Sequence, residues 1–246
     1  MEILSINNPR IKQWKKYEKR KYRDQDGQFL VEEEHLIEEA IAANVLVTLL
    51  VLQGKNNTLD FDGEVIEVSQ VVLDKLSTHV SSVSMIGVCR QLDLKPVKMD
   101  RIIYLDNVQD PGNVGTIIRT AFALGYDAIY TSETSVDMYN EKVIRATQGA
   151  LFHMPIVKGN LLEIMKNHQA YGVHVYATAL DAQAKQLTKV DVKVPYALTF
   201  GNEGSGVSSQ ILAQANTKVM IEMERFESLN VAVAAGICMY EFYHKR

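Results

Sequence analysis

The chain has 246 residues, 47% hydrophobic and 23% charged, which is the composition of a globular protein with one large domain or two modest ones. No apolar run approaches the ~18 residues of a membrane span, and the N-terminus has no apolar signal segment, so we expect a cytoplasmic protein without a membrane partner. Cys89 and Cys238 lie far apart and outside any C-x-x-C pair, which argues against a disulfide framework and a zinc site, and we expect no metal.

The net charge of −4 is unevenly distributed. Residues 1–25 hold eight Lys or Arg against three Asp or Glu, a net +5, which leaves −9 on residues 26–246. Trp14, Tyr17 and Tyr22 are interleaved with these basic residues, a pattern that suits phosphate contact and base stacking. Because Ile11, Trp14 and Tyr17 also recur at helical spacing, an amphipathic helix with a solvated basic face is an equal alternative.

The first half of the chain alternates strands with helices. In chain order we expect a strand at 28–31, a helix ending near Asn44, strands at 45–53 and 63–70, a helix at 69–77 with Ser69 as its N-cap, and a strand at 85–92. This order predicts a small α/β unit over residues 1–92. Residues 93–100 are polar and contain Pro96, so we predict a linker there, followed by a second domain at 101–246.

The second half repeats the strand–helix pattern. We expect strands at 101–107, 127–132, 173–180, from 196 onward and at 217–223, with helices at 116–125, 140–150, 161–172, 207–215 and 229–245. Gly125 is placed to end the first of these helices in a left-handed conformation. Strands followed by helices predict a largely parallel sheet, whose ligands bind at the carboxyl ends of the strands.

The last helix is apolar nearly all round from Val231 to Tyr240. A helix of this kind has to be buried on all sides. A second subunit covers a C-terminal helix most easily, so the pattern predicts a homodimer.

The first of three unusual loops, residues 106–116, reads DNVQDPGNVGT. Pro111 and Gly112 predict a tight turn, and Asn113 is placed to cap the helix that follows. Arg119 lies on this otherwise apolar helix, and its face is shared with three small residues, Gly115, Thr116 and Ala123. The small face leaves room for a ligand beside the guanidinium, although an interface contact or a carboxylate partner is an equal interpretation.

The other two loops cover residues 200–208 and 222–230. The former reads G-x-x-G-x-G rather than the dinucleotide-binding G-x-G-x-x-G, and Glu203 among the glycines would repel a phosphate. It therefore faces a cationic or neutral group, or Glu203 turns aside to hold an arginine. In the latter, Ser228 and Asn230 bracket a helix start, where capping side chains are expected.

In this order, DNVQDPGNVGTIIRTA, LTFGNEGSGV and IEMERFESLNVAVAAG resemble the three motifs of the SpoU-type (TrmH-like) RNA 2′-O-ribose methyltransferases of the SPOUT superfamily. KVIRATQGALFHMPI is also similar, so the resemblance covers about residues 101–246. FLVEEEHLIEEA is similar, more loosely, to the ribosomal-protein-like RNA-binding domain of many members, with Glu33 where Gly is usual. Glu222 replaces a usual Pro, and the loop before Ser228 is shorter and lacks a Gly, so we expect a locally altered donor pocket.

The resemblance implies a C-terminal parallel-sheet α/β domain with a deep trefoil knot, a smaller N-terminal α/β RNA-binding domain, and a homodimer through the C-terminal domain. It implies methyl transfer from S-adenosyl-L-methionine, a sulfonium donor, to a ribose 2′-hydroxyl of RNA, with ribosomal RNA favoured. Transfer RNA and a catalytically silent RNA-binding scaffold are the alternatives. A nucleotide-dependent oxidoreductase is disfavoured because G-x-G-x-x-G is absent.

The resemblance also implies roles for particular residues. It places the donor against Thr178, Ala179, Gly201, Asn202, Gly206, Ile221, Met223 and Leu229, and catalysis on Arg119, Asn113, Glu203, Ser228 and Asn230. For RNA contact we predict Arg10, Lys12, Lys15, Lys16, Lys19 and Arg145. A guanidinium keeps its proton in proteins, so we expect Arg119 to hold a phosphate or stabilise the developing alkoxide rather than act as a base. Asn113, Ser228 and Asn230 would orient donor, ribose and loops, and Glu203 would fix Arg119 or a loop amide.

Overall fold

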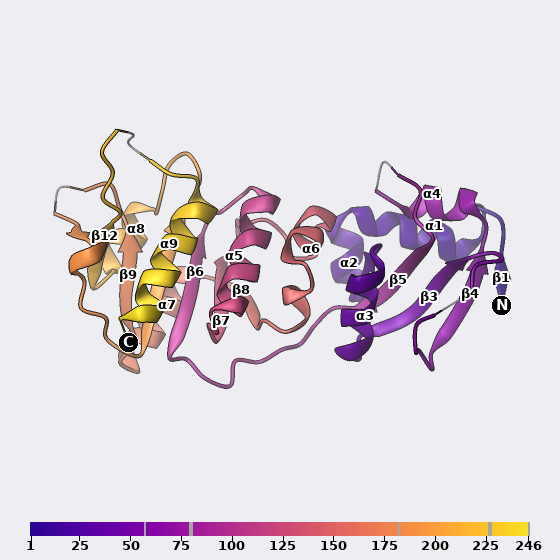
Figure 1. The fold of residues 1–246 in the computed structure, drawn as a ribbon, viewed down its shortest axis with the longest axis horizontal. Helices are drawn as coiled ribbons and strands as arrows, with labels where there is room; N and C mark the ends of the chain where they lie inside the picture. Colours follow the sequence, from indigo (N-terminus) through magenta and orange to yellow (C-terminus); the bar gives the residue numbers. More distant parts are fainter. Residues whose placement is uncertain (57, 79–80, 182, 226–227, 246) are drawn as a thin grey trace. The chain divides into compact units, whose positions relative to one another are not determined.

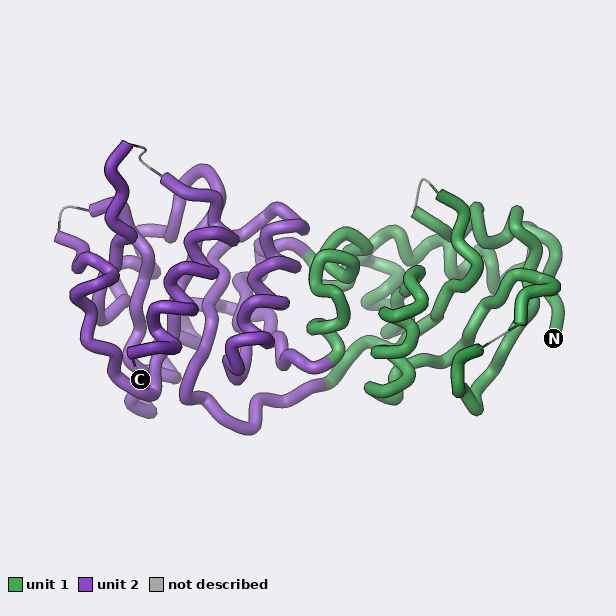
Figure 2. The backbone as a smooth tube through the Cα atoms, viewed as in Figure 1, with its two compact units in different colours: residues 1–93, 137–152 green, residues 94–136, 153–246 purple. Residues whose placement is uncertain are grey.

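The computed structural model describes residues 1–56, 58–78, 81–181, 183–225 and 228–245 (Figure 1). The chain forms two compact units, unit 1 from residues 1–93 and 137–152, and unit 2 from residues 94–136 and 153–246 (Figure 2). Residues 137–152 therefore belong to unit 1, although the sequence predicts them within the domain 101–246. The boundaries 1–92, 93–100 and 101–246 stay a prediction about independently folding domains.

Unit 1 is built on a five-stranded mixed sheet in the order β1-β4-β3-β5-β2. The strands β1, β4 and β3 run parallel, whereas β5 is antiparallel to both β3 and β2. Its elements are β1 (Glu2–Ile3), α1 (Pro9–Lys15), the 3-10 turn η1 (Lys16–Glu18), α2 (Arg20–Asp26), β2 (Gln28–Val31), α3 (Glu34–Ala42), β3 (Leu46–Leu52), β4 (Glu64–Val68), α4 (Gln70–Leu76), β5 (Met85–Arg90), α6 (Glu141–Thr147) and η2 (Ala150–Phe152).

The basic N-terminal stretch forms α1, η1 and α2. Asn8 caps α1 by accepting a hydrogen bond from the Arg10 amide at 2.9 Å. Ile11, Trp14 and Tyr17 are buried in the core of unit 1, so the predicted apolar face is confirmed, although the helix is interrupted. Ser69 is the residue before α4, as predicted, but its hydroxyl donates to the Leu4 carbonyl at 3.0 Å instead of capping the helix.

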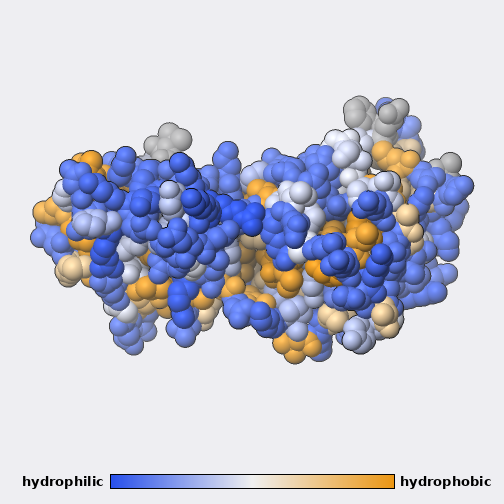
Figure 3. All heavy atoms as spheres, turned by 180° about the vertical axis from the view of Figure 1, so that it is seen from behind, coloured by the Kyte–Doolittle hydropathy of each residue, from blue (hydrophilic) through white to orange (hydrophobic). Residues whose placement is uncertain are grey.

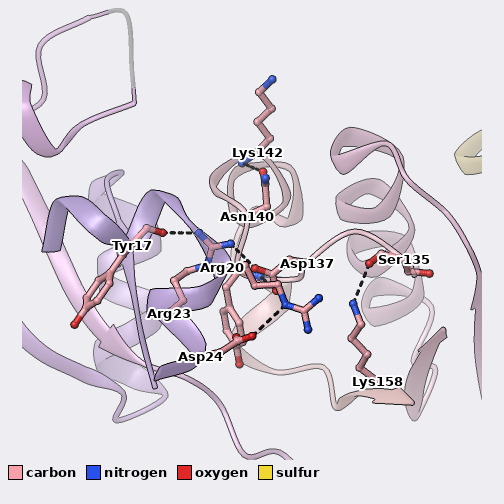
Figure 4. A network of polar contacts seen from close by, with 10 residues as sticks. Tyr17, Arg20, Arg23, Asp24, Ser135, Asp137, Asn140, Lys142 and Lys158 are labelled. Carbon is pink, nitrogen blue, oxygen red and sulfur yellow. Dashed lines mark hydrogen bonds and ion pairs between the residues drawn. The ribbon is translucent and has the colours of Figure 1, made fainter. Parts of the chain in front are cut away.

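The segment 137–152 joins unit 1 through a buried ion pair. Arg23 of α2 is buried, and its guanidinium pairs with Asp137 and donates to the Tyr17 carbonyl (Figure 4). A buried guanidinium is costly without a counter-charge, so Asp137 is what allows Arg23 to lie there. The ring of Phe29 in β2 packs against Tyr139 at a centroid distance of 4.6 Å, which extends the same core.

Unit 2 is built on a seven-stranded sheet in the order β10-β12-β9-β11-β6-β7-β8, in which every described pair is parallel, as predicted. Helices α5 and α9 lie on one face, and α7 and α8 lie on the other (Figure 1). The elements are β6 (Arg101–Asp106), α5 (Pro111–Ala123), β7 (Ala128–Ser132), β8 (Ile156–Gly159), α7 (Leu161–Ala170), β9 (His174–Thr178), β10 (Lys185–Gln186), η3 (Leu187–Lys189), β11 (Tyr196–Gly201), α8 (Ser209–Gln214), β12 (Thr217–Met220) and α9 (Val231–His244).

The side chains of the central strands are buried because helices cover both faces of the sheet. All six residues of β11 are buried, and so is all of β6 after Arg101. A parallel strand with helices on both faces has no polar side, so it reads as a nearly continuous apolar run.

The start of α5 differs from the prediction. The predicted tight turn at Pro111 and Gly112 and the capping role of Asn113 are wrong, because the helix already begins at Pro111 and Asp110 is its N-cap. The Asp110 side chain accepts a hydrogen bond from the Asn113 amide at 2.8 Å. Proline suits the first helical position and aspartate the position before it. At the other end, Gly125 adopts a φ of +67°, which confirms the predicted left-handed ending.

Both cysteines are free and buried. Within the described residues, no helix has the length and apolar character that crossing a membrane requires. The face of the molecule seen in Figure 3 is largely hydrophilic with apolar patches between, as is usual for a protein surface in water.

Candidate functional site

The described residues of the three unusual loops meet at one edge of the sheet of unit 2; residues 226 and 227 of the third loop lie outside the described residues. They follow β6, β11 and β12, and all three strands run in the same direction. Gly201 at the end of β11 is the direct partner of Asp106 at the end of β6. This is the carboxyl edge of the sheet, where ligands bind in open parallel sheets.

The glycine-rich loop closes on itself directly after β11. Asn202 and Gly206 exchange two backbone hydrogen bonds of 3.0 and 2.9 Å, and the Asn202 side chain accepts from the Gly204 amide at 3.0 Å. A Cβ on Gly201 would lie 2.1 Å from backbone atoms of Gly206 and Val207, so only glycine fits at position 201. The Asn202 amide group also donates to the Asn107 carbonyl at 3.0 Å, which ties this loop to the one after β6.

Glu203 forms the main link between these two loops. Its carboxylate accepts hydrogen bonds from the Gln109 amide at 3.2 Å, the Asp110 amide at 3.0 Å and the Asn113 side chain at 3.1 Å. The sequence predicts that Glu203 binds either Arg119 or a loop amide, and in the structure it binds loop amides. None of its hydrogen bonds within the described part of the chain goes to Arg119.

The charge of Glu203 is stabilised by these donors. Burial raises the pKa of the Glu203 carboxyl, but hydrogen bonds from the Asp110 amide, the Asn113 side chain and the backbone amides of Glu203 and Gln109 lower it, and the pKa lies below its usual value. The carboxylate also lies at the N-terminus of α5, where the helix dipole favours a negative charge. The glycine-rich loop therefore carries its negative charge to hold the neighbouring helix start.

Asn113 connects Glu203 to the third loop through Asn230. Asn230 is the N-cap of α9, as predicted, and its side-chain oxygen accepts from the Ala232 amide at 2.9 Å. Its amide nitrogen donates to the Asn113 oxygen at 2.9 Å, while the Asn113 nitrogen donates to Glu203. A continuous hydrogen-bonded chain, Glu203–Asn113–Asn230, thus joins all three loops.

A cavity of about 730 Å³ opens beside this chain. A volume of this size is typical of a small-molecule site. The eight residues predicted to contact the donor all line it: Thr178, Ala179, Gly201, Asn202, Gly206, Ile221, Met223 and Leu229. Sequence reasoning missed Leu180 and Asp181, although their position directly after β9, at the same sheet edge, was a usable signal.

The five predicted catalytic residues divide into three groups. Glu203 and Ser228 line the cavity, while Asn113 and Asn230 are not part of the described lining and connect to Glu203. Arg119 is exposed on α5, six residues and roughly 9 Å along the helix axis from Asn113. In the described structure it belongs neither to the lining nor to the hydrogen-bonded chain.

The predicted RNA-contacting residues all fall in unit 1. Lys12, Lys16 and Lys19 are exposed, and Arg145 is half-buried on α6. Lys15 pairs with Glu18, and Arg10 pairs with Glu64 and lies 4.8 Å from the centroid of the Trp14 ring. The hydrogen bond from Arg10 lowers the pKa of Glu64 to about 2, so this ion pair persists at neutral pH.

Comparison with known proteins agrees with this arrangement. Residues 100–240 match the model of the SpoU rRNA Methylase family, and residues 8–87 match the MRM3-like substrate binding domain. The chain is 34% identical over 243 residues to 23S rRNA (guanosine(2553)-2′-O)-methyltransferase RlmP of Bacillus subtilis (strain 168), covering 97% of this chain and 98% of that protein.

Two solved structures with AdoMet bound are also similar. The rRNA methyltransferase from Sinorhizobium meliloti superposes with a TM-score of 0.87 at 29% identity, over 99% of this chain and 97% of that one. The SpoU methyltransferase AviRb from Streptomyces viridochromogenes has a TM-score of 0.87 at 26% identity, over 97% of this chain and 98% of that one. With a family match over more than half its length and a relative aligned almost end to end, the chain belongs to the SpoU rRNA methylase family.

Proposed function

We propose that this protein transfers a methyl group from S-adenosyl-L-methionine to the 2′-hydroxyl of a ribose in ribosomal RNA. The observation that carries the proposal is the Glu203–Asn113–Asn230 chain, which fixes the three loops around one cavity. Ribosomal RNA is favoured over transfer RNA because the Bacillus subtilis relative, aligned over nearly the whole chain, is named for 23S rRNA.

The chemistry of the cavity suits this donor. Its described lining holds two carboxylates, Asp181 and Glu203, and no lysine, arginine or histidine. Such a lining disfavours a phosphate and suits a donor that carries none, although the Asp181 carboxylate is itself paired with Lys218 at 2.7 Å. When bound, S-adenosyl-L-methionine supplies an electrophilic methyl group on a sulfonium. The residues that would hold it are the eight lining residues named above.

The protein then has to activate and place the ribose oxygen. A protonated hydroxyl is a poor nucleophile, and it loses its proton as the bond from oxygen to the methyl carbon forms. The guanidinium of Arg119 is exposed, so it is available to hold a phosphate or to stabilise the developing negative charge on the oxygen. Ser228 in the lining would orient the donor or the ribose, and the Asn113–Asn230 pair holds the loops in place.

We expect Arg119→Ala to lower methyl transfer by at least ~10²-fold, the scale for the loss of one preorganised donor. Donor binding should be unchanged, because Arg119 lies outside the cavity lining as described. Arg119→Lys should restore little activity, since lysine lacks the planar fork of the guanidinium. Single-turnover transfer from labelled donor at saturating RNA measures the chemical step without interference from binding.

The matched control for Arg119 is Lys166→Ala, which removes an exposed cation from α7 on the other face of the same unit. This variant should transfer at the normal rate. Near-normal transfer by Arg119→Ala would exclude Arg119 from the mechanism, and loss of its folding or donor binding would assign Arg119 a structural role.

We further propose a homodimer through unit 2. The inner side of α9 is buried at Ala235, Cys238 and Phe242, but Val233, Ile237 and Tyr240 are 53%, 40% and 59% exposed. These three residues recur every three or four positions and so share one face of the helix. An apolar helix face of this kind is usually covered by a partner.

Light scattering at micromolar concentration should give the mass of two chains. Ile237→Arg should shift that mass to one chain, because it places a charge in the apolar interface. Val97→Arg is the control, since Val97 is apolar and 95% exposed but lies away from α9 in sequence. A single-chain mass for the unaltered protein would contradict the dimer.

We propose that the basic face of unit 1 contacts RNA, together with Arg145. RNA binding should weaken as the salt concentration rises. Replacing the three exposed lysines Lys12, Lys16 and Lys19 by Gln should flatten the slope of log affinity against log salt by roughly 2, because each neutralised phosphate on a single strand contributes about 0.7. Replacing Arg10 and Lys15 should flatten it less, because carboxylates already neutralise them. An unchanged slope after the triple replacement would make the lysines an ordinary solvated helix face.

The family resemblance carries one further proposal, and cysteine usage another. We propose that unit 2 contains a deep trefoil knot, which tracing of the chain in an experimental structure would test. We also propose a cytoplasmic location, in keeping with two free cysteines, which cell fractionation would test.

A further inference from the structure

One wall of the cavity continues directly from the end of β12. Val219 and Met220 of the strand line the cavity, and so do Ile221 and Met223 in the extension beyond it. Beyond Met220 the chain has left the sheet, so strand pairing no longer holds the extension in place. Glu222 stands between the two lining residues of this extension and is exposed.

Glu222 connects this wall to the turn η3. Its carboxylate accepts a hydrogen bond from the hydroxyl of Thr188. That bond lowers the pKa of the Glu222 carboxyl, so the carboxylate is charged at neutral pH and the bond is charge-assisted. The strand β10, directly before η3, pairs with the end of β12 through Gln186 and Met220.

The turn η3 is itself firmly anchored. The ammonium group of Lys245, next to the end of α9, donates to the carbonyl oxygens of Leu187, Thr188 and Val190 at 2.9, 2.7 and 3.4 Å. The side chains of Leu187 and Val190 are buried. The backbone of Thr188 is therefore held in place, and a side chain that bonds to the Thr188 hydroxyl is held next to the turn.

We propose that Glu222 is a positioning residue for the methyl donor: by bonding to Thr188 it holds Ile221 and Met223 against the donor. This inference rests on the proposed function. Glu222 restricts the backbone of the extension through a side-chain hydrogen bond to an anchored turn. A wall that is already ordered costs less conformational entropy when the ligand binds.

The test measures donor affinity by calorimetry and transfer rates at saturating donor. Glu222→Ala and Thr188→Val should each raise the dissociation constant of S-adenosyl-L-methionine about 3- to 10-fold, the range for one net hydrogen bond. The rate at saturating donor should stay unchanged, because Glu222 acts on binding and not on the reacting atoms. Both side chains are exposed, so the variants should fold.

Three further variants sharpen the test. The double variant should bind the donor no more weakly than Glu222→Ala alone, because Glu222→Ala already removes the bond that Thr188→Val removes. Glu222→Gln keeps an acceptor oxygen and should recover part of the affinity. Glu224→Ala removes a carboxylate from an exposed position in the same segment and should bind the donor normally.

Normal donor affinity in Glu222→Ala, or an equal loss in Glu224→Ala, would overturn the positioning role while leaving the proposed function intact. Additive losses in the double variant would also overturn it, since the two side chains would then act separately. If the unaltered protein binds no donor, the proposed function fails and this inference fails with it.

Discussion

The carboxylate of Glu203 is the group on which the geometry of the site depends. It comes from one loop and binds the start of α5 through the amides of Gln109 and Asp110. Through Asn113 it also reaches Asn230, which caps α9. Two helix starts and a glycine-rich loop are thereby fixed to one another by a single negative charge. Without it, the amides of Gln109 and Asp110 and the side chain of Asn113 would lose their shared carboxylate and bind water instead, so the loops would lose this connection.

This arrangement separates two tasks within unit 2. The Glu203–Asn113–Asn230 chain connects the loops beside the cavity, and apolar and small residues form most of the lining. The glycine-rich loop takes part in both tasks, because the absence of a side chain at Gly201 lets its backbone fold back on Gly206 and Val207. The wall after β12 is the part held outside this chain, and there Glu222 and Thr188 supply the restraint.

Much of this was predictable from the sequence, because strand order in a parallel sheet determines where loops gather. β2 has the predicted bounds, and the eight residues assigned to the donor line one cavity because they follow strands that end at the same edge. The family motifs supplied what spacing alone could not, namely which of several polar loops belong together. The Asn113 error arose because Asp, Pro and Asn all suit a helix start, and the sequence does not rank them.

Other features depend on contacts between distant parts of the chain. The segment 137–152 joins unit 1 because Asp137 pairs with Arg23, 114 positions away. No local sequence pattern predicts such a pair. The strands β8 and β10 were not predicted. All four residues of β8 are half-buried and β10 has only two residues, so neither shows a clear alternation of buried and exposed positions. The Glu222–Thr188 bond is likewise visible only once η3 lies beside the end of β12.

The central claim is that this fold methylates a ribose of ribosomal RNA, and mapping of 2′-O-methyl groups in total RNA tests it most directly. Cells that lack the protein should lose one ribose methylation in ribosomal RNA. The unaltered protein should restore that methylation, and Arg119→Ala should not. An unchanged ribosomal RNA, or a methyl group lost from transfer RNA instead, would contradict the account.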